Sequence, residues 1–140
     1  MPRPIRDCIR IDPCRLAIVA VSFADPVLFF WRTNLIYVLA VITAKSGQRE
    51  QILDAFHANS PTVRAEAGCI EYRAAVDAEN ALPMQTPYGE DTFVVVEKWQ
   101  DMESLRAHAA APHMAAYSAA TKGWVANRTI HILSPVPAES

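Results

Sequence analysis

The residues best suited to chemistry lie together in the last third of the chain, where residues 97–114 read EKWQDMESLRAHAAAPHM. This segment holds His108 and His113, and Pro112 stands between them. Histidine changes charge close to neutral pH, so either ring can serve as a general base. Pro112 has no amide proton, and its ring crowds the carbonyl of His108, four residues earlier. The helix that carries His108 is therefore expected to bend or restart at Pro112.

The spacing of the two histidines argues against a metal site. On an unbroken helix five residues correspond to roughly 140° of rotation, so His108 and His113 do not form the i, i+4 pair that a zinc site uses. His108 is either a general base or a structural side chain that bonds a carbonyl freed at the helix break. His113 shares a helix face with Tyr117, and Trp124 continues that face. These three residues form either an aromatic core or one wall of a ligand pocket, where a buried histidine and tyrosine find polar partners.

Two predicted strands supply further aromatic candidates. Phe93 and Trp99 share one face of the later strand, and Tyr72 lies on the earlier one. Each is either a core residue or a wall of an aromatic pocket. Glu97 shares the face of Trp99 whereas Lys98 points the other way, so one face must bury a charge. A structural pairing of these charges is favoured over a role for Glu97 in a cavity.

The alternating periodicities predict the elements that must position these side chains. They give the order βαββαβ, with strands at 35–42, 69–76, 92–99 and 128–133 and helices at 49–67 and 101–124. We expect the first helix to kink or split at Pro61 and to end at Gly68, and the second to begin at an Asp101 cap and to be interrupted at Pro112. Residues 77–91 are rich in turn formers and form a loop. This order is the ferredoxin-like α+β arrangement, in which helices cover one face of an antiparallel sheet.

The other face of the predicted sheet also needs a cover. A one-sided antiparallel sheet alternates apolar with polar residues, whereas residues 35–42 and 92–96 are apolar on both faces. An identical subunit that packs sheet against sheet is the economical cover. The predicted assembly is therefore a homodimer joined through its sheet faces, which is a dimeric α+β barrel.

The length fits one domain with an N-terminal extension. The chain has 140 residues, close to the usual size of a single domain, and residues 34–140 hold all the predicted elements. Residues 1–33 are expected to lie outside the core, as a flexible arm, a signal peptide or the product of an over-long gene start. No apolar run reaches the ~20 residues of a membrane span, so no membrane partner is predicted.

Charge and cysteine content narrow the function further. The net charge of −2 and the pI near 6.1 provide no basic footprint for nucleic acid, so nucleic-acid binding is excluded. The three cysteines lack CxxC spacing, which disfavours both a disulfide framework and a structural zinc site. Reduced thiols of this kind predict a cytoplasmic protein.

Together the motifs resemble a known family. Residues 68–72 form a G-C-x-x-Y strand, followed by a strand that ends in E-x-W at Trp99, a helix with A-H at His108, and P-H at residues 112–113. In this order, over about residues 34–140, the chain resembles the antibiotic-biosynthesis-monooxygenase family, in particular its small quinol monooxygenases. The resemblance implies a dimeric α+β barrel, and an enzyme that uses no flavin, metal or other cofactor.

The reaction that the resemblance implies is a cofactor-independent monooxygenation of a quinol-, hydroquinone- or anthrone-like aromatic substrate by O₂. The substrate is deprotonated, and its electron-rich anion reduces O₂ directly inside a water-poor cavity. The side chains that this chemistry would use are the base His113 or His108, the donors Tyr117 and Tyr72, and the pocket walls Trp99, Phe93 and Trp124. The interior of the first strand lacks the asparagine of some haem-degrading and polyketide-oxidising relatives, which disfavours haem cleavage.

Two other functions fit the same fold. A small-molecule isomerase would use the same histidines as acid and base without consuming O₂. A non-catalytic ligand-binding dimer would bind a small molecule and release no product. Oxygen uptake during turnover distinguishes the three.

Overall fold

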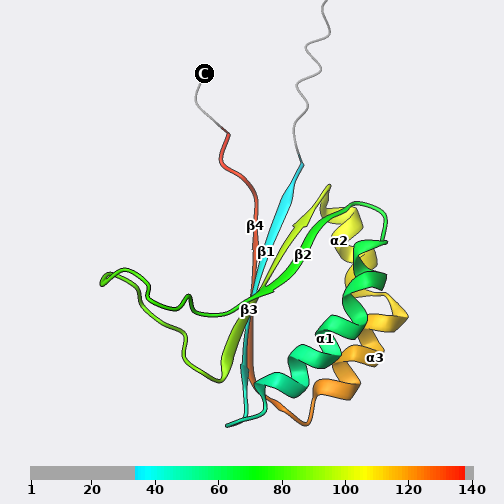
Figure 1. Ribbon diagram of the computed structural model, residues 1–140. Coiled ribbons are helices and arrows are strands. Elements are labelled where there is room, and N and C mark those ends of the chain that lie inside the picture. The colour runs from blue at the N-terminus through cyan, green and yellow to red at the C-terminus, as the bar shows by residue number, and fades with distance from the viewer. Residues whose placement is uncertain (1–33, 138–140) are drawn as a thin grey trace, which may run out of the picture. The chain divides into compact units, whose positions relative to one another are not determined.

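The computed structural model describes residues 34–137, which form a four-stranded antiparallel sheet with three helices on one face (Figure 1). The elements are β1 (Ile36–Ala44), α1 (Arg49–Arg64), β2 (Cys69–Ala75), β3 (Thr92–Trp99), α2 (Met102–Ala109), α3 (Pro112–Thr121) and β4 (Val125–Leu133). The strand order is β2-β3-β1-β4, and every neighbouring pair is antiparallel. The predicted ferredoxin-like α+β fold is confirmed. The predicted extension, residues 1–33, lies outside the described residues.

Side-chain alternation explains how the central strands build the core. The buried face of β1 carries Ile36, Val38, Ala40, Ile42 and Ala44, and the buried face of β3 carries Phe93, Val95, Glu97 and Trp99. α1 packs Ile52, Phe56 and Val63 into the same core. Each large apolar side chain buried in this way contributes about 1.5–3 kcal/mol relative to an exposed one. The core therefore lies between the helices and one face of the sheet.

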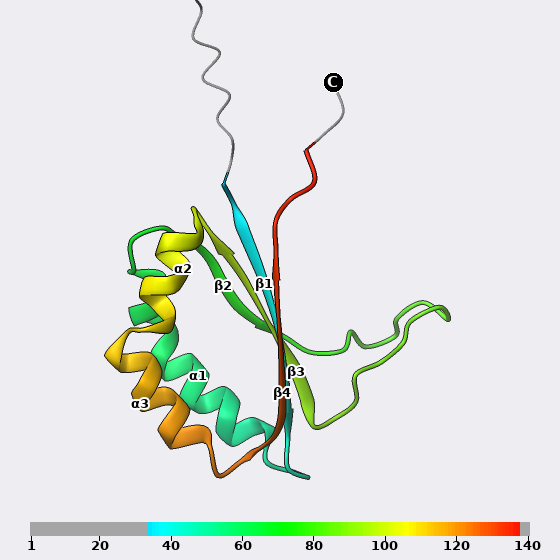
Figure 2. The ribbon, with the colours of Figure 1, turned by 180° about the vertical axis from the view of Figure 1, so that it is seen from behind.

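The second face of the sheet is apolar as well, as the sequence predicted. It carries Leu39 and Val41 of β1 and Val94 and Val96 of β3, all of them only half-buried. Residues 76–91, which join β2 to β3, contain no helix or strand and extend to the side away from the helices (Figure 2). Within residues 34–137, none of the helices has the length and apolar character needed to cross a membrane.

The predicted helix break is confirmed. Asp101 caps α2, because its Oδ1 accepts a hydrogen bond from the amide of Ser104 at 2.8 Å. α2 ends at Ala109, and α3 begins at Pro112 after the extended residue Ala111. Pro112 occupies the first turn of α3, where its missing amide proton has no helical partner to lose. His108 and His113 therefore belong to two different helices.

The end of α1 differs from the prediction. Pro61 lies inside a single helix that ends at Arg64, with Ala65 as its C-cap. Of the predicted kink or split at Pro61, the split is therefore wrong, and so is the predicted end at Gly68. The missing amide proton of Pro61 removes only one bond near the end of the helix, which the structure tolerates. Gly68 instead has a φ of +80° and completes the turn into β2. Glu66 lies in this turn.

Candidate active site

A cavity of about 480 Å³ lies between α2, α3 and the sheet face that they cover. Its floor consists of alternate strand residues, namely Val38, Ala40 and Ile42 of β1 and Arg128, Ile130 and Ile132 of β4. The helices contribute Leu105, His108, Met114 and Tyr117, and Tyr72 of β2 and Glu97 of β3 complete the polar lining. A largely apolar cavity with a few polar groups is the usual form of a small-molecule site.

His108 is the histidine that lines this cavity. Its side chain is only 5% exposed. The ring lies 4.6 Å from the ring of Trp99, centroid to centroid, and meets the ring of Tyr72 edge-on at 5.7 Å. These two aromatic contacts restrict the orientation of the imidazole.

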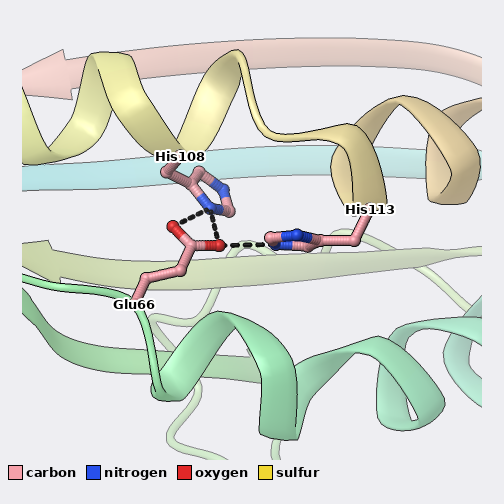
Figure 3. A group of neighbouring side chains, drawn as sticks. All are labelled: Glu66, His108 and His113. Atoms are coloured by element: carbon pink, nitrogen blue, oxygen red, sulfur yellow. Dashed lines mark hydrogen bonds and ion pairs between the residues drawn. The ribbon is translucent and has the colours of Figure 1, made fainter.

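Glu66 joins His108 to His113 from the turn after α1 (Figure 3). Its two carboxylate oxygens each lie 3.1 Å from Nδ1 of His108, and its Oε1 lies 2.6 Å from Nε2 of His113. The side chain of Glu66 is 16% exposed and that of His113 is 27% exposed. Neither belongs to the lining of the cavity. Glu66 therefore supports His108 from outside the cavity.

The carboxylate determines which nitrogen of His108 is available to a ligand. A carboxylate only accepts hydrogen bonds, so Nδ1 of His108 donates, and a neutral ring then keeps its lone pair on Nε2. Within residues 34–137 no protein group bonds to Nε2. An imidazole that is oriented by a carboxylate and has its other nitrogen free is suited to act as a general base.

Two tyrosines supply hydrogen-bond donors to the cavity. The hydroxyl of Tyr117 is buried and has no partner in the described part of the chain. Burial raises the pKa of Tyr117, and burial together with the charge of Glu97 raises the pKa of Tyr72 above the ordinary range of a phenol. Both hydroxyls therefore stay protonated at neutral pH. An unpartnered buried donor costs about 1–3 kcal/mol, so a ligand that accepts a hydrogen bond from Tyr117 recovers this energy.

Glu97 lines the cavity, so the predicted charge pairing is wrong for this residue. Its Oε2 accepts a hydrogen bond from Nε1 of Trp99 at 2.8 Å. Burial raises the pKa of Glu97, although the Trp99 hydrogen bond and the charge of His108 oppose this effect. Lys98 points to the other face, with its Nζ 5.5 Å from the ring centre of Tyr37. An indole N–H thus takes the place of the expected ionic partner of Glu97.

Seven side chains were predicted from the sequence as catalytic or substrate-binding, and three of them line the cavity: Tyr72, His108 and Tyr117. Trp99 and Phe93 are completely buried in the core, and Trp124 is half-buried against it. In the described chain, Trp99, Phe93 and Trp124 do not line the cavity, so their position favours the interpretation as core residues. Trp99 still affects the site through its contacts with His108 and Glu97.

The structure corrects the expected position of His113. The sequence predicted that His113 and Tyr117 share one cavity wall, but only Tyr117 is found there. α3 restarts at Pro112, and His113, in its first turn, meets Glu66 instead. His113 therefore contacts Glu66, which in turn contacts His108.

The same three residues could hold a metal ion. Glu66, His108 and His113 each offer one ligand atom, and these atoms all lie within 4.8 Å of one another. Because His108 and His113 lie on two helices separated by the break at Pro112, the spacing of ligands on one unbroken helix does not apply to them. An ion bound here would replace the hydrogen bonds of Glu66 and occupy Nδ1 of His108.

Glu66 and Arg128 were not predicted as functional residues. Glu66 precedes Gly68 and the G-C-x-x-Y strand by two residues, but nothing local links it to a histidine more than 40 residues away. Arg128 begins the predicted fourth strand. Because Arg128, Ile130 and Ile132 are each two residues apart, the sequence did place them on a common face of that strand.

Known proteins resemble this chain in sequence and in fold. The sequence profile described as antibiotic biosynthesis monooxygenase matches residues 35–120. The protein named "Probable quinol monooxygenase YgiN" of Escherichia coli (strain K12) is 39% identical over 103 residues, which cover 72% of this chain and 98% of YgiN. The crystal structure of PA3566 from Pseudomonas aeruginosa has a TM-score of 0.62 at 25% identity and covers 74% of this chain and 95% of its own. The structure of Rv0793 from Mycobacterium tuberculosis has a TM-score of 0.61 at 20% identity, and the match covers 76% of this chain and 99% of Rv0793.

Proposed function

Because the chain belongs to the antibiotic biosynthesis monooxygenase family and is thereby a monooxygenase, we propose that it oxidises a quinol-, hydroquinone- or anthrone-like aromatic compound with O₂ and without a cofactor. The observation that carries this proposal is the position of His108. Glu66 holds one nitrogen of its ring, and the ring lines an apolar cavity that also holds the unpartnered hydroxyl of Tyr117. The name of the relative YgiN supports a quinol as the substrate class.

The first step is removal of a proton from the substrate. Nε2 of His108 accepts the proton from a ring hydroxyl, or from the reactive ring carbon of an anthrone. Glu66 keeps the proton on Nδ1 and stabilises the positive charge that develops on the ring. Tyr117 and Tyr72 donate hydrogen bonds to the oxyanion of the substrate. The buried apolar side chains of β1 lower the polarity of the cavity floor, which strengthens these interactions.

The second step is electron transfer from the substrate anion to O₂. One oxygen atom forms a bond to a ring carbon, and the O–O bond then breaks. The other oxygen leaves as water with two protons, one from His108 and one lost by the oxygenated ring carbon. For a hydroquinone, the substrate and O₂ give a hydroxylated quinone and water. The substrate supplies all four electrons, so atoms and electrons balance without an external reductant.

The proposal includes a homodimer joined through the second face of the sheet. Leu39, Val41, Val94 and Val96 make this face apolar, and they remain half-exposed in the single chain. An apolar face of this kind is usually covered by a partner. Light scattering at micromolar concentration should give twice the mass of the chain, and a monomer alone would contradict the dimer.

Oxygen uptake tests the activity. The purified chain is mixed with a panel of hydroquinones and anthrones in an oxygen electrode, and products are identified by mass spectrometry. We expect uptake of one O₂ per substrate, and His108→Ala should lower kcat by ~10²-fold or more, as for loss of a general base. His57→Ala is the matched control, because His57 is exposed on α1 and outside the cavity lining.

Each alternative outcome has a defined meaning. Unchanged uptake in His108→Ala would show that this histidine is not the base. Product formation without uptake of O₂ would favour the isomerase, with the same histidine as acid and base. Ligand binding with no product from any compound would favour a non-catalytic binding protein.

A further inference from the structure

Resting on the proposed function, we infer that Arg128 makes the cavity selective for aromatic diols that carry a negatively charged group at the end remote from the hydroxyl that His108 deprotonates. Arg128 lines the cavity from β4, on the same face as Ile130 and Ile132. Among the described lining residues it is the only arginine or lysine. A guanidinium at the edge of an apolar floor offers a carboxylate or sulfonate two parallel hydrogen bonds.

The strand register shows that Arg128 is far from the catalytic end. Val38 of β1 pairs with Glu97 of β3, and Ile42 of β1 pairs with Arg128 of β4. Four residues along β1 separate these two rows, which corresponds to about 13 Å at ~3.3 Å per residue. Glu97 therefore marks one end of the cavity and Arg128 the other. His108 lies at the Glu97 end, because its ring packs against Trp99, the hydrogen-bond partner of Glu97.

The charge of Arg128 is not neutralised within the described chain. The ion pairs found among residues 34–137 involve Arg49, Arg73, His108 and His113, and none includes Arg128. Glu97 is the sole carboxylate in the described lining, and it lies in the distant row. The charge of Arg128 still reaches the cavity, because it lowers the pKa of Tyr117 against the larger effect of burial. An anionic ligand would supply the missing counter-charge.

A solvated surface arginine is the alternative interpretation. Arg128 is exposed in the single chain, but the alternation of β4 places Thr129 and His131 on the opposite face of the sheet. Arg128 thus occupies the face that α2 and α3 cover, in line with Ile130 and Ile132. A cation at the open end of an otherwise apolar surface is better explained by an anionic ligand than by solvation alone.

The separation also limits the shape of the ligand. The flexible arginine side chain shortens the distance that the ligand must span, so one aromatic ring with a short acidic side chain can reach from His108 to Arg128. A neutral quinol of the same size would fill the apolar floor but leave the guanidinium without a partner. 2,5-Dihydroxyphenylacetate is an aromatic diol with a short acidic side chain. Its methyl ester is a neutral diol of nearly the same size.

Binding is measured without O₂, so that the result does not depend on turnover. The full chain is titrated anaerobically with the acid and with the ester by isothermal titration calorimetry. We expect the acid to bind about tenfold more tightly than the ester, and the preference to weaken as salt is added. Arg128→Gln should abolish the preference and leave ester binding nearly unchanged, while Arg128→Lys should retain part of it. Arg106→Gln, at an exposed position on α2, is the matched control and should behave as the unmodified chain.

The outcomes separate this inference from the proposed function. Equal binding of acid and ester, no binding of either, or a preference that survives in Arg128→Gln would refute the role of Arg128. A preference that depends on Arg128, without oxygen uptake in the presence of air, would support the anion site and refute the oxygenase. Oxygen uptake with no charge preference would refute the anion site alone.

Discussion

Replacement of Glu66 by glutamine tests whether one carboxylate outside the cavity controls the chemistry inside it. Glutamine has almost the same shape, but it has one acceptor oxygen and one donor group in place of two acceptors. In the native protein both oxygens face Nδ1 of His108, and Oε1 also binds Nε2 of His113. In either orientation of the glutamine amide, its NH2 group therefore faces Nδ1 of His108, and in the present tautomer two donors meet there.

The size of the effect follows from these contacts. A hydrogen bond to a charged group contributes about 1.5–3 kcal/mol, and the variant loses at least one. The side chain of Glu66 is 16% exposed, so water replaces part of the loss, and the lower half of this range is expected. For a domain of this size, a loss of about 1.5–2 kcal/mol lowers Tm by roughly 5–15 °C. The larger effect is on kcat, which should fall ~10²-fold because His108 no longer keeps its lone pair on Nε2.

Three measurements are needed, all well below the lowered Tm. Urea unfolding gives the free energy of unfolding, and oxygen uptake gives kcat. NMR of the imidazole nitrogens gives the tautomer of His108, which should be Nδ1–H in the native protein and mixed in Glu66→Gln. Glu79→Gln is the matched control, because Glu79 is exposed in the loop between β2 and β3.

One combination of results would refute the reasoning. If Glu66→Gln loses stability but keeps both kcat and the native tautomer of His108, the carboxylate only ties the α1 turn to the helices. If kcat falls while the tautomer is unchanged, Glu66 acts through its charge and not through proton placement.

Three further predictions concern the turn, the buried acid and the metal ligands. Gly68→Ala should destabilise the chain by about 2 kcal/mol or more in urea, because φ is +80° and the new Cβ would lie 2.6 Å from Cβ of Ser104; a loss under about 1 kcal/mol would contradict this. Burial raises the pKa of Glu97 in the folded chain above the value of about 4.3 that it has in the unfolded chain. The native chain therefore loses stability as pH rises from the unfolded pKa through the folded pKa and Glu97 ionises. Glu97→Gln keeps an acceptor for Trp99 but cannot ionise, so its free energy of unfolding should rise relative to that of the native chain between pH 4 and pH 8. A difference between the two free energies that stays constant over this range would contradict the prediction. Micromolar Zn²⁺ should inhibit oxygen uptake reversibly by taking Nδ1 of His108, and His113→Ala should weaken the inhibition; equal inhibition of both chains would place the ion elsewhere.

Local signals in the sequence were sufficient for the order of elements and for several details of the site. The proline at 112 divides the helix and Asp101 caps it, because both effects depend on neighbours within four residues. The period-2 pattern of β3 correctly placed Phe93, Val95, Glu97 and Trp99 on one face. The prediction failed at the end of α1, because a proline in the last turn removes only one backbone hydrogen bond, which is too little to split the helix.

Tertiary structure decided which histidine reaches the cavity and what supports it. Glu66 is 42 residues from His108 and 47 from His113 in sequence, and they meet only because α1, α2 and α3 pack on the same face of the sheet. The distance of Arg128 from Glu97 likewise depends on the pairing of β1 with both β3 and β4. Residue types and periodicity specify which side chains can do chemistry and which face they occupy. Contacts between distant segments arise from packing and strand register, which no local pattern encodes, so the composition of the site became visible only in the folded chain.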